Sequence, residues 1–97
     1  MLVHVVVWKY KDDISQVKKF EHISKLKALP GAINNILNFE VGNDVIHSER
    51  SYDTGLVAAF QDREALDAYA VHAAHQEVAA LGSEISEHIA SVDFFID

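Results

Sequence analysis

The chain has 97 residues, which is enough for one small domain with a single hydrophobic core. Hydrophobic residues make up 49% of it and cysteine is absent, which excludes a core-poor disordered segment, a disulfide framework and a thiolate metal site. The net charge of -7 disfavours a surface that binds nucleic acid phosphates. The sequence therefore predicts one domain that spans residues 1–97.

Residues 2–10 predict the first strand. They are rich in valine and aromatic residues, and both faces of the strand are apolar, with Val3, Val5 and Val7 on one face and Leu2, Val6 and Trp8 on the other. This stretch lacks the basic region and the cleavage site of a signal peptide, and no apolar run reaches the roughly 20 residues that span a bilayer. We expect a cytoplasmic protein that binds neither membranes nor nucleic acid.

The next two segments predict a helix and a second strand. Asp13, followed three residues later by Gln16, resembles a capping box that opens a helix. The apolar side chains then follow at helical spacing, at Val17, Phe20, Ile23 and Leu26. Residues 30–31, a Pro-Gly pair, predict the end of the helix, and residues 33–41 predict an extended segment.

The second half of the chain repeats this order. Residues 53–60 predict a short apolar strand, and Asp62 is suited to cap a second helix that bends near His72. Residues 89–96 predict the last strand. The order strand, helix, strand, strand, helix, strand is that of a ferredoxin-like α+β fold, with a four-stranded antiparallel sheet and two helices on one face.

The sheet face without helices predicts a homodimer. Such a face normally alternates polar and apolar residues, but the first strand is apolar on both sides. A second subunit is the most economical cover, with the two sheets facing each other and the helices outside.

Several stretches resemble the stress-responsive dimeric α/β-barrel (Dabb) family over nearly the whole chain. They are residues 4–10, 29–31, 40–42, 52–53, 65–75 and 92–94. The most specific element is Tyr69-x-x-His72-x-x-His75, although Ala73 stands where many members have proline. The resemblance implies a homodimeric barrel with a small cavity between the sheet and the helices of each subunit.

His75 and Tyr69 are the candidate catalytic residues. An imidazole whose pKa is near 6.5 can remove a proton at neutral pH, and a tyrosine hydroxyl can donate a hydrogen bond to an enolate oxygen. The resemblance to the cyclase members of the family implies a base role for His75 and a substrate-oxygen contact for Tyr69. The two groups suit cofactor-free proton abstraction beside a carbonyl, followed by ring closure or isomerisation. The alternative is that both are structural residues of the core or its rim.

Further residues are candidates for binding the substrate. His4 shares a strand face with Val6 and Trp8, and its side chain either enters the cavity or bonds to a neighbouring element. The full candidate set is His4, Val6, Trp8, Phe20, His72 and Val78. The remaining histidines, at positions 22, 47 and 88, are expected to be exposed and without a role.

The sequence favours neither a metal nor a cofactor. Two histidines three residues apart lack the further ligands of a stable site, and the scattered glycines form no phosphate loop. We expect the ligand to be a small apolar or carbonyl-containing molecule. Two alternatives stay open: a non-catalytic stress-response module that binds a metabolite or a protein, and a monooxygenase or haem-degrading relative.

Overall fold

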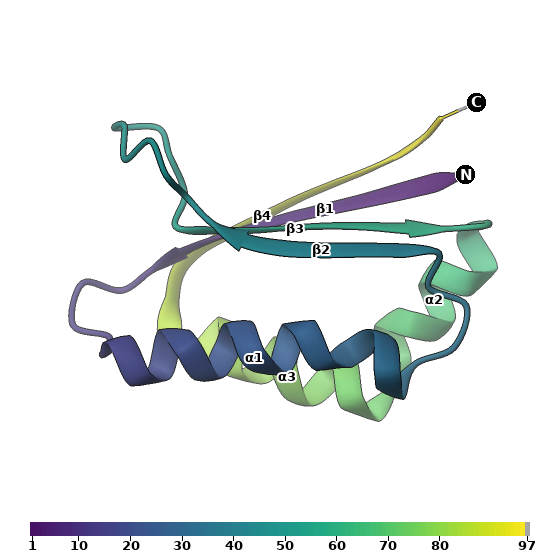
Figure 1. The fold of residues 1–97 in the computed structure, drawn as a ribbon, viewed down its shortest axis with the longest axis horizontal. Coiled ribbons are helices and arrows are strands. Elements are labelled where there is room, and N and C mark those ends of the chain that lie inside the picture. The colour runs from purple at the N-terminus through teal and green to yellow at the C-terminus, as the bar shows by residue number, and fades with distance from the viewer. Residues whose placement is uncertain (97) are drawn as a thin grey trace.

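The computed structural model describes residues 1–96, in which one antiparallel sheet carries all the helices on one face (Figure 1). The strands are β1 (Leu2–Tyr10), β2 (Asn38–Asn43), β3 (Thr54–Phe60) and β4 (Ser86–Phe95), in the spatial order β2-β3-β1-β4. The helices are α1 (Gln16–Ala32), α2 (Arg63–Val71) and α3 (Ala73–Ile85). The predicted ferredoxin-like fold is confirmed, with the second helix divided into α2 and α3.

Helix α1 begins at a different cap from the one that the sequence predicts. Ser15 is the N-cap, and its Oγ accepts a hydrogen bond from the backbone nitrogen of Lys18 at 3.2 Å. The capping box expected at Asp13 is therefore wrong. A serine hydroxyl meets the free N–H groups of the first turn as well as a carboxylate does, so Asp13 and Ser15 both suit the cap position in this sequence.

The end of α1 also lies beyond the predicted stop. The helix continues through Pro30 to Ala32, and the backbone N–H of Ile33 donates to the carbonyl of Leu29 at 2.9 Å. Pro30 removes one donor within the last turn, so only one backbone hydrogen bond is lost there. Asn35 then adopts a positive φ of 69°, which turns the chain, and β2 starts at Asn38 rather than at residue 33.

The buried face of α1 is rotated relative to the predicted one. His22, Leu26 and Leu29 face the sheet, whereas Val17 and Phe20 are 77% and 72% exposed. The expectation that His22 is exposed is wrong, because its side chain is fully buried. Spacings of four and three residues join His22 to Leu26 and Leu29, so the buried stripe follows a regular helical pattern that a polar residue type disguises.

His22 belongs to an aromatic cluster beneath β1. Its Nδ1 lies 2.8 Å from the hydroxyl of Tyr10, and its ring meets the ring of Trp8 edge to face at 5.0 Å between centroids. Its Nε2 has no hydrogen-bond partner among residues 1–96. Burial lowers the pKa of His22 to about 4, so the side chain is neutral in the folded protein at neutral pH.

The same cluster explains a glycine in the last turn of α3. A methyl group on Gly82 would lie 3.0 Å from Nε2 of His22 and 3.0 Å from Nε1 of Trp8, both on buried rings. Alanine there gains helix propensity but forces two rigid rings apart, and overpacking of this kind costs about 1–3 kcal/mol. The close approach of α3 to β1 therefore depends on Gly82.

We expect Gly82→Ala to lower the free energy of unfolding by about 1–2 kcal/mol. Gly31, near the end of α1, is the matched control, because nothing lies within 4 Å of its added methyl group. Gly31→Ala should raise stability by about 0.5 kcal/mol, since alanine restricts the unfolded chain. Urea unfolding of both variants measures the difference. Equal effects of the two substitutions would contradict this account of the packing.

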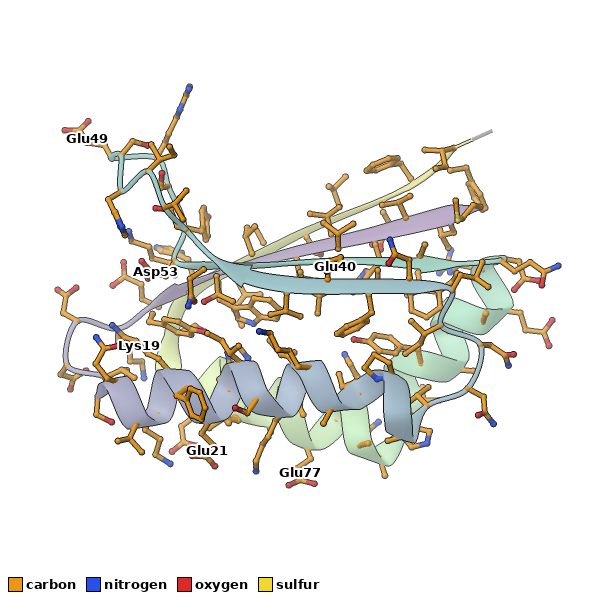
Figure 2. All side chains as sticks on the ribbon, viewed as in Figure 1. Lys19, Glu21, Glu40, Glu49, Asp53 and Glu77 are labelled. Carbon is orange, nitrogen blue, oxygen red and sulfur yellow. The ribbon has the colours of Figure 1, made fainter. Side chains whose placement is uncertain are left out.

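The layer between the sheet and the helices contains the core, and charged side chains such as Glu21 and Glu77 point away from it (Figure 2). Its largest fully buried side chains include Phe60, Leu56 and Ile85. No helix within residues 1–96 is long and apolar enough to cross a membrane.

The sheet face that carries no helix is apolar. We call it the open face, and its apolar residues are Val3, Val5, Val7, Val57, Ala59, Ala90, Val92 and Phe94. Val57, Val92 and Phe94 are 43%, 56% and 44% exposed. The loop between β2 and β3 rises on the same side, opposite to the helices (Figure 1). The apolar character predicted for both faces of β1 is confirmed.

Candidate functional site

A cavity of about 260 Å³ lies between the sheet and the helices. All six elements other than β2 contribute to its wall, which is formed by His4, Val6, Trp8, Leu26, Leu56, Tyr69, His75, Val78, Ala79, Ser83, Ile89 and Ser91. Six of the eight predicted site residues line this one space. Most of the wall is apolar, and the two histidines and the tyrosine supply its ionisable groups.

Tyr69 reaches the cavity from α2. Its side chain is 2% exposed and packs on the ring of Phe60 at 5.1 Å between centroids. Burial raises the pKa of Tyr69 to about 12, so its hydroxyl stays protonated at neutral pH. The group can donate a hydrogen bond to an oxygen of a bound molecule.

His75 reaches the cavity from the first turn of α3. Its Nδ1 lies 3.0 Å from the carbonyl oxygen of Ala70, and its ring centroid lies 4.5 Å from the ring centroid of Tyr69. A carbonyl only accepts, so Nδ1 of His75 carries the proton and Nε2 keeps its lone pair. Burial lowers the pKa of His75, and the nearby His4 acts in the same direction, against the contact with Ala70. A neutral imidazole with a free Nε2 can accept a proton.

The junction of α2 and α3 brings Tyr69 and His75 together. Asp62 caps α2 by accepting from the backbone nitrogen of Ala65 at 2.9 Å, as predicted. The chain is extended at His72, whose own Nδ1 accepts from the backbone nitrogen of Ala74 at 3.1 Å and so starts α3. The predicted bend near His72 is confirmed, and it forms without a proline at position 73.

Two of the predicted substrate-binding residues lie outside the cavity. The ring of His72 is exposed and is turned to the N-terminus of α3. Phe20 lies on the outward-turned side of α1, beside a separate depression of about 290 Å³. Phe20 is therefore not part of the cavity that the other candidates Trp8 and Val78 line, because α1 buries the stripe that contains His22 instead.

Asp93 is a residue that the sequence reasoning missed. It is the direct partner of His4 across the β1–β4 pair, and its Oδ1 is hydrogen-bonded to Nδ1 of His4. Strand alternation places Asp93 on the same face as Ser91 and Ile89, but only the register shows that it meets His4.

Other parts of the described structure offer less to a reactive ligand. A larger depression of about 610 Å³ lies on the open face beside the β2–β3 loop, and no histidine lines it. Within residues 1–96, no three histidine, aspartate or glutamate side chains gather in a way that could hold a metal ion. The cavity with Tyr69 and His75 is therefore the candidate site.

The fold and this cavity define a ferredoxin-like α+β protein with a cavity lined by histidine and tyrosine between its sheet and its helices. The chain belongs to the stress responsive A/B barrel domain (Dabb) family, whose model matches residues 2–96. The predicted membership is confirmed. A comparison with curated proteins finds no match.

Solved structures share the fold over almost the whole chain. A dimeric ferredoxin-like protein of unknown function from Thermobifida fusca has a TM-score of 0.89 and 23% identity, covering 98% of this chain and 90% of that one. A dimeric protein of unknown function from Bacteroides fragilis has a TM-score of 0.85 and 26% identity, with 98% and 95% covered. The hydroxynitrile lyase from Passiflora edulis has a TM-score of 0.89 and 16% identity, with 99% and 93% covered. The likeness to the first and third shows the fold alone.

Proposed function

We propose that the protein is a homodimer in which the open faces of two subunits pack together. The apolar residues of that face support this arrangement, because a single subunit leaves them in contact with water. Val92, on the edge strand β4, is 56% exposed. The similar proteins from Thermobifida fusca and Bacteroides fragilis are described as dimeric. Such packing removes apolar surface from water and leaves the cavity of each subunit on the other side of its sheet.

We propose further that the cavity binds a small apolar or carbonyl-containing molecule and catalyses its cofactor-free enolisation. The observation that carries this proposal is the contact of His75 Nδ1 with the carbonyl of Ala70, which leaves Nε2 unprotonated, on a ring whose centroid lies 4.5 Å from that of the protonated Tyr69. His75 removes a proton from the carbon next to the carbonyl, and the C–H electron pair moves toward the carbonyl oxygen. Tyr69 donates a hydrogen bond to that oxygen as its negative charge develops.

The enolate gives the site two outcomes. Its carbon can attack a second carbonyl of the same molecule, which closes a ring. It can also take a proton at a different carbon, which isomerises the molecule. Because the cavity is small and largely apolar, it favours a compact, uncharged substrate.

Exchange of carbon-bound hydrogen for deuterium tests this function without knowledge of the natural substrate. Phenylacetone in D₂O serves as the probe, and ¹H NMR follows the loss of its signals beside the carbonyl. We expect the protein to accelerate exchange and His75→Ala to lower the enzymatic rate by about 100-fold or more, because the general base is removed.

His72→Asn is the matched control. It removes an exposed imidazole three residues away, and asparagine still caps α3. The control should exchange phenylacetone at the native rate. Saturable binding of phenylacetone without any exchange would identify a non-catalytic binding module instead, and equal rates for His75→Ala and the native chain would remove His75 as the base.

A further inference from the structure

The pairing of His4 with Asp93 fixes which nitrogen of His4 faces the cavity. The two residues are direct partners on neighbouring strands, and Nδ1 of His4 is bonded to Oδ1 of Asp93. An ionised carboxylate only accepts hydrogen bonds, so Nδ1 of His4 is the donor. Nε2 is therefore the nitrogen of His4 that remains for a bound molecule.

The ring of His4 lies beside Tyr69, as does the ring of His75. Its centroid lies 6.0 Å from that of Tyr69, which in turn lies 4.5 Å from that of His75. The side chain of His4 is 15% exposed, and it lines the same cavity as the other two. The cavity thus contains two imidazoles that both lie beside the ring of Tyr69.

Asp93 lies on the outer side of His4. It lines a second depression, of about 380 Å³, which also contains Arg63 and Asp67 and to which His4 contributes. The side chain of Asp93 is 39% exposed, so its carboxylate keeps contact with water while it holds His4. The hydrogen bond to Asp67 raises the pKa of Arg63, and the charge of Asp93 adds to this effect.

The two histidines have partners of different charge. Nδ1 of His75 meets the neutral carbonyl of Ala70, whereas Nδ1 of His4 meets a carboxylate. A carboxylate stabilises an imidazolium directly behind it, and a carbonyl does so far less. Tyr69 keeps its proton because burial holds its pKa at about 12, so another group must supply the proton that converts an enolate to an enol.

We propose that His4 is the general acid of the enolisation proposed above, on which this inference rests, and that Asp93 is its positioning residue. In the forward step, Nε2 of His75 takes the proton from the carbon beside the carbonyl. The C–H electron pair forms the new C=C bond, and the carbonyl π pair moves to oxygen. That oxygen takes the Nε2 proton of the His4 imidazolium. The products are the enol, a protonated His75 and a neutral His4, so charge and atoms balance.

The tautomer of His4 tests the positioning role independently of any substrate. We expect the imidazole ¹⁵N NMR signals of the intact protein, assigned to His4 by their loss in His4→Gln, to show a protonated Nδ1. Asp93→Asn should keep this tautomer, because the amide oxygen also accepts, whereas Asp93→Ala should release it. Glu87→Ala, which removes an exposed carboxylate of the same strand, is the control and should change nothing.

The exchange rate of phenylacetone tests the acid role. We expect Asp93→Asn and Asp93→Ala each to slow exchange by about tenfold or more, because the imidazolium loses its anionic partner, while Glu87→Ala keeps the native rate. Native tautomer and native rate in Asp93→Ala would overturn the inference. If the native chain exchanges no phenylacetone, the proposed function fails, and the ¹⁵N signals alone still decide whether Asp93 positions His4.

Discussion

Val5→Glu is expected to be a monomer at micromolar concentrations at which the native chain is a dimer. Val5 lies at the centre of the open face, with Val57 and Val92 as its partners on the two neighbouring strands. In a single subunit a glutamate at this position faces water. In the dimer it would be buried opposite apolar side chains without a cation, which costs several kcal/mol. We therefore expect the dissociation constant to rise by about a thousandfold or more.

Sedimentation equilibrium of the native chain and the variant measures this change, and circular dichroism establishes that the monomer keeps its fold. Val17→Glu is the control, because Val17 is 77% exposed in the first turn of α1, outside the open face. An acidic residue near a helix N-terminus is also favourable there. A native monomer, or a dimer of Val5→Glu with the native affinity, would contradict the proposed assembly.

β1 and β3 could be predicted from the sequence because their burial follows a simple rule, whereas β2 and β4 begin at other residues than the sequence predicts. In β1 the side chains of both faces are apolar, so the run of valines identifies the strand. The alternation of side chains then assigns each residue to one of its two faces. The helix α1 was harder, because its buried stripe includes His22 while Phe20, a large apolar side chain, faces water. Residue type gives only an average tendency to be buried, and the packing of α1 against β1 decides the rotation of this helix.

The candidate site was predictable only where its residues lie close together in the sequence. Tyr69 and His75 belong to one short element of the sequence, so a local motif identifies both. Whether His72 joins them depends on the backbone at the junction of α2 and α3, where its ring becomes a cap. Asp93 lies 89 residues from His4 in the sequence, and only the register of β1 and β4 brings the two together.

The buried His22 is expected to make the protein sensitive to acid. Its pKa is about 4 in the folded chain, against the usual value of 6.5 when the chain unfolds. Above pH 6.5 it is neutral in both states and contributes no pH dependence. As the pH falls from 6.5 to 4, the unfolded chain binds a proton that the folded chain does not, so the free energy of unfolding falls. The difference in pKa corresponds to about 3 kcal/mol, and the lowered pKa of His75 acts in the same direction.

Urea unfolding across this pH range, at a fixed protein concentration, measures the effect. The fluorescence of Trp8 follows the unfolding, because it is the one tryptophan of the chain and contacts His22. His22→Gln keeps a polar side chain beside Tyr10 but has no proton to gain, so its stability should fall much less between pH 6.5 and 4. The quantity compared is the change in the free energy of unfolding between pH 6.5 and 4. A loss of packing that is the same at every pH does not alter this change. His47→Gln, in the exposed β2–β3 loop, should keep the native pH dependence. A native pH dependence in His22→Gln would show that groups other than the fully buried His22 cause the acid sensitivity.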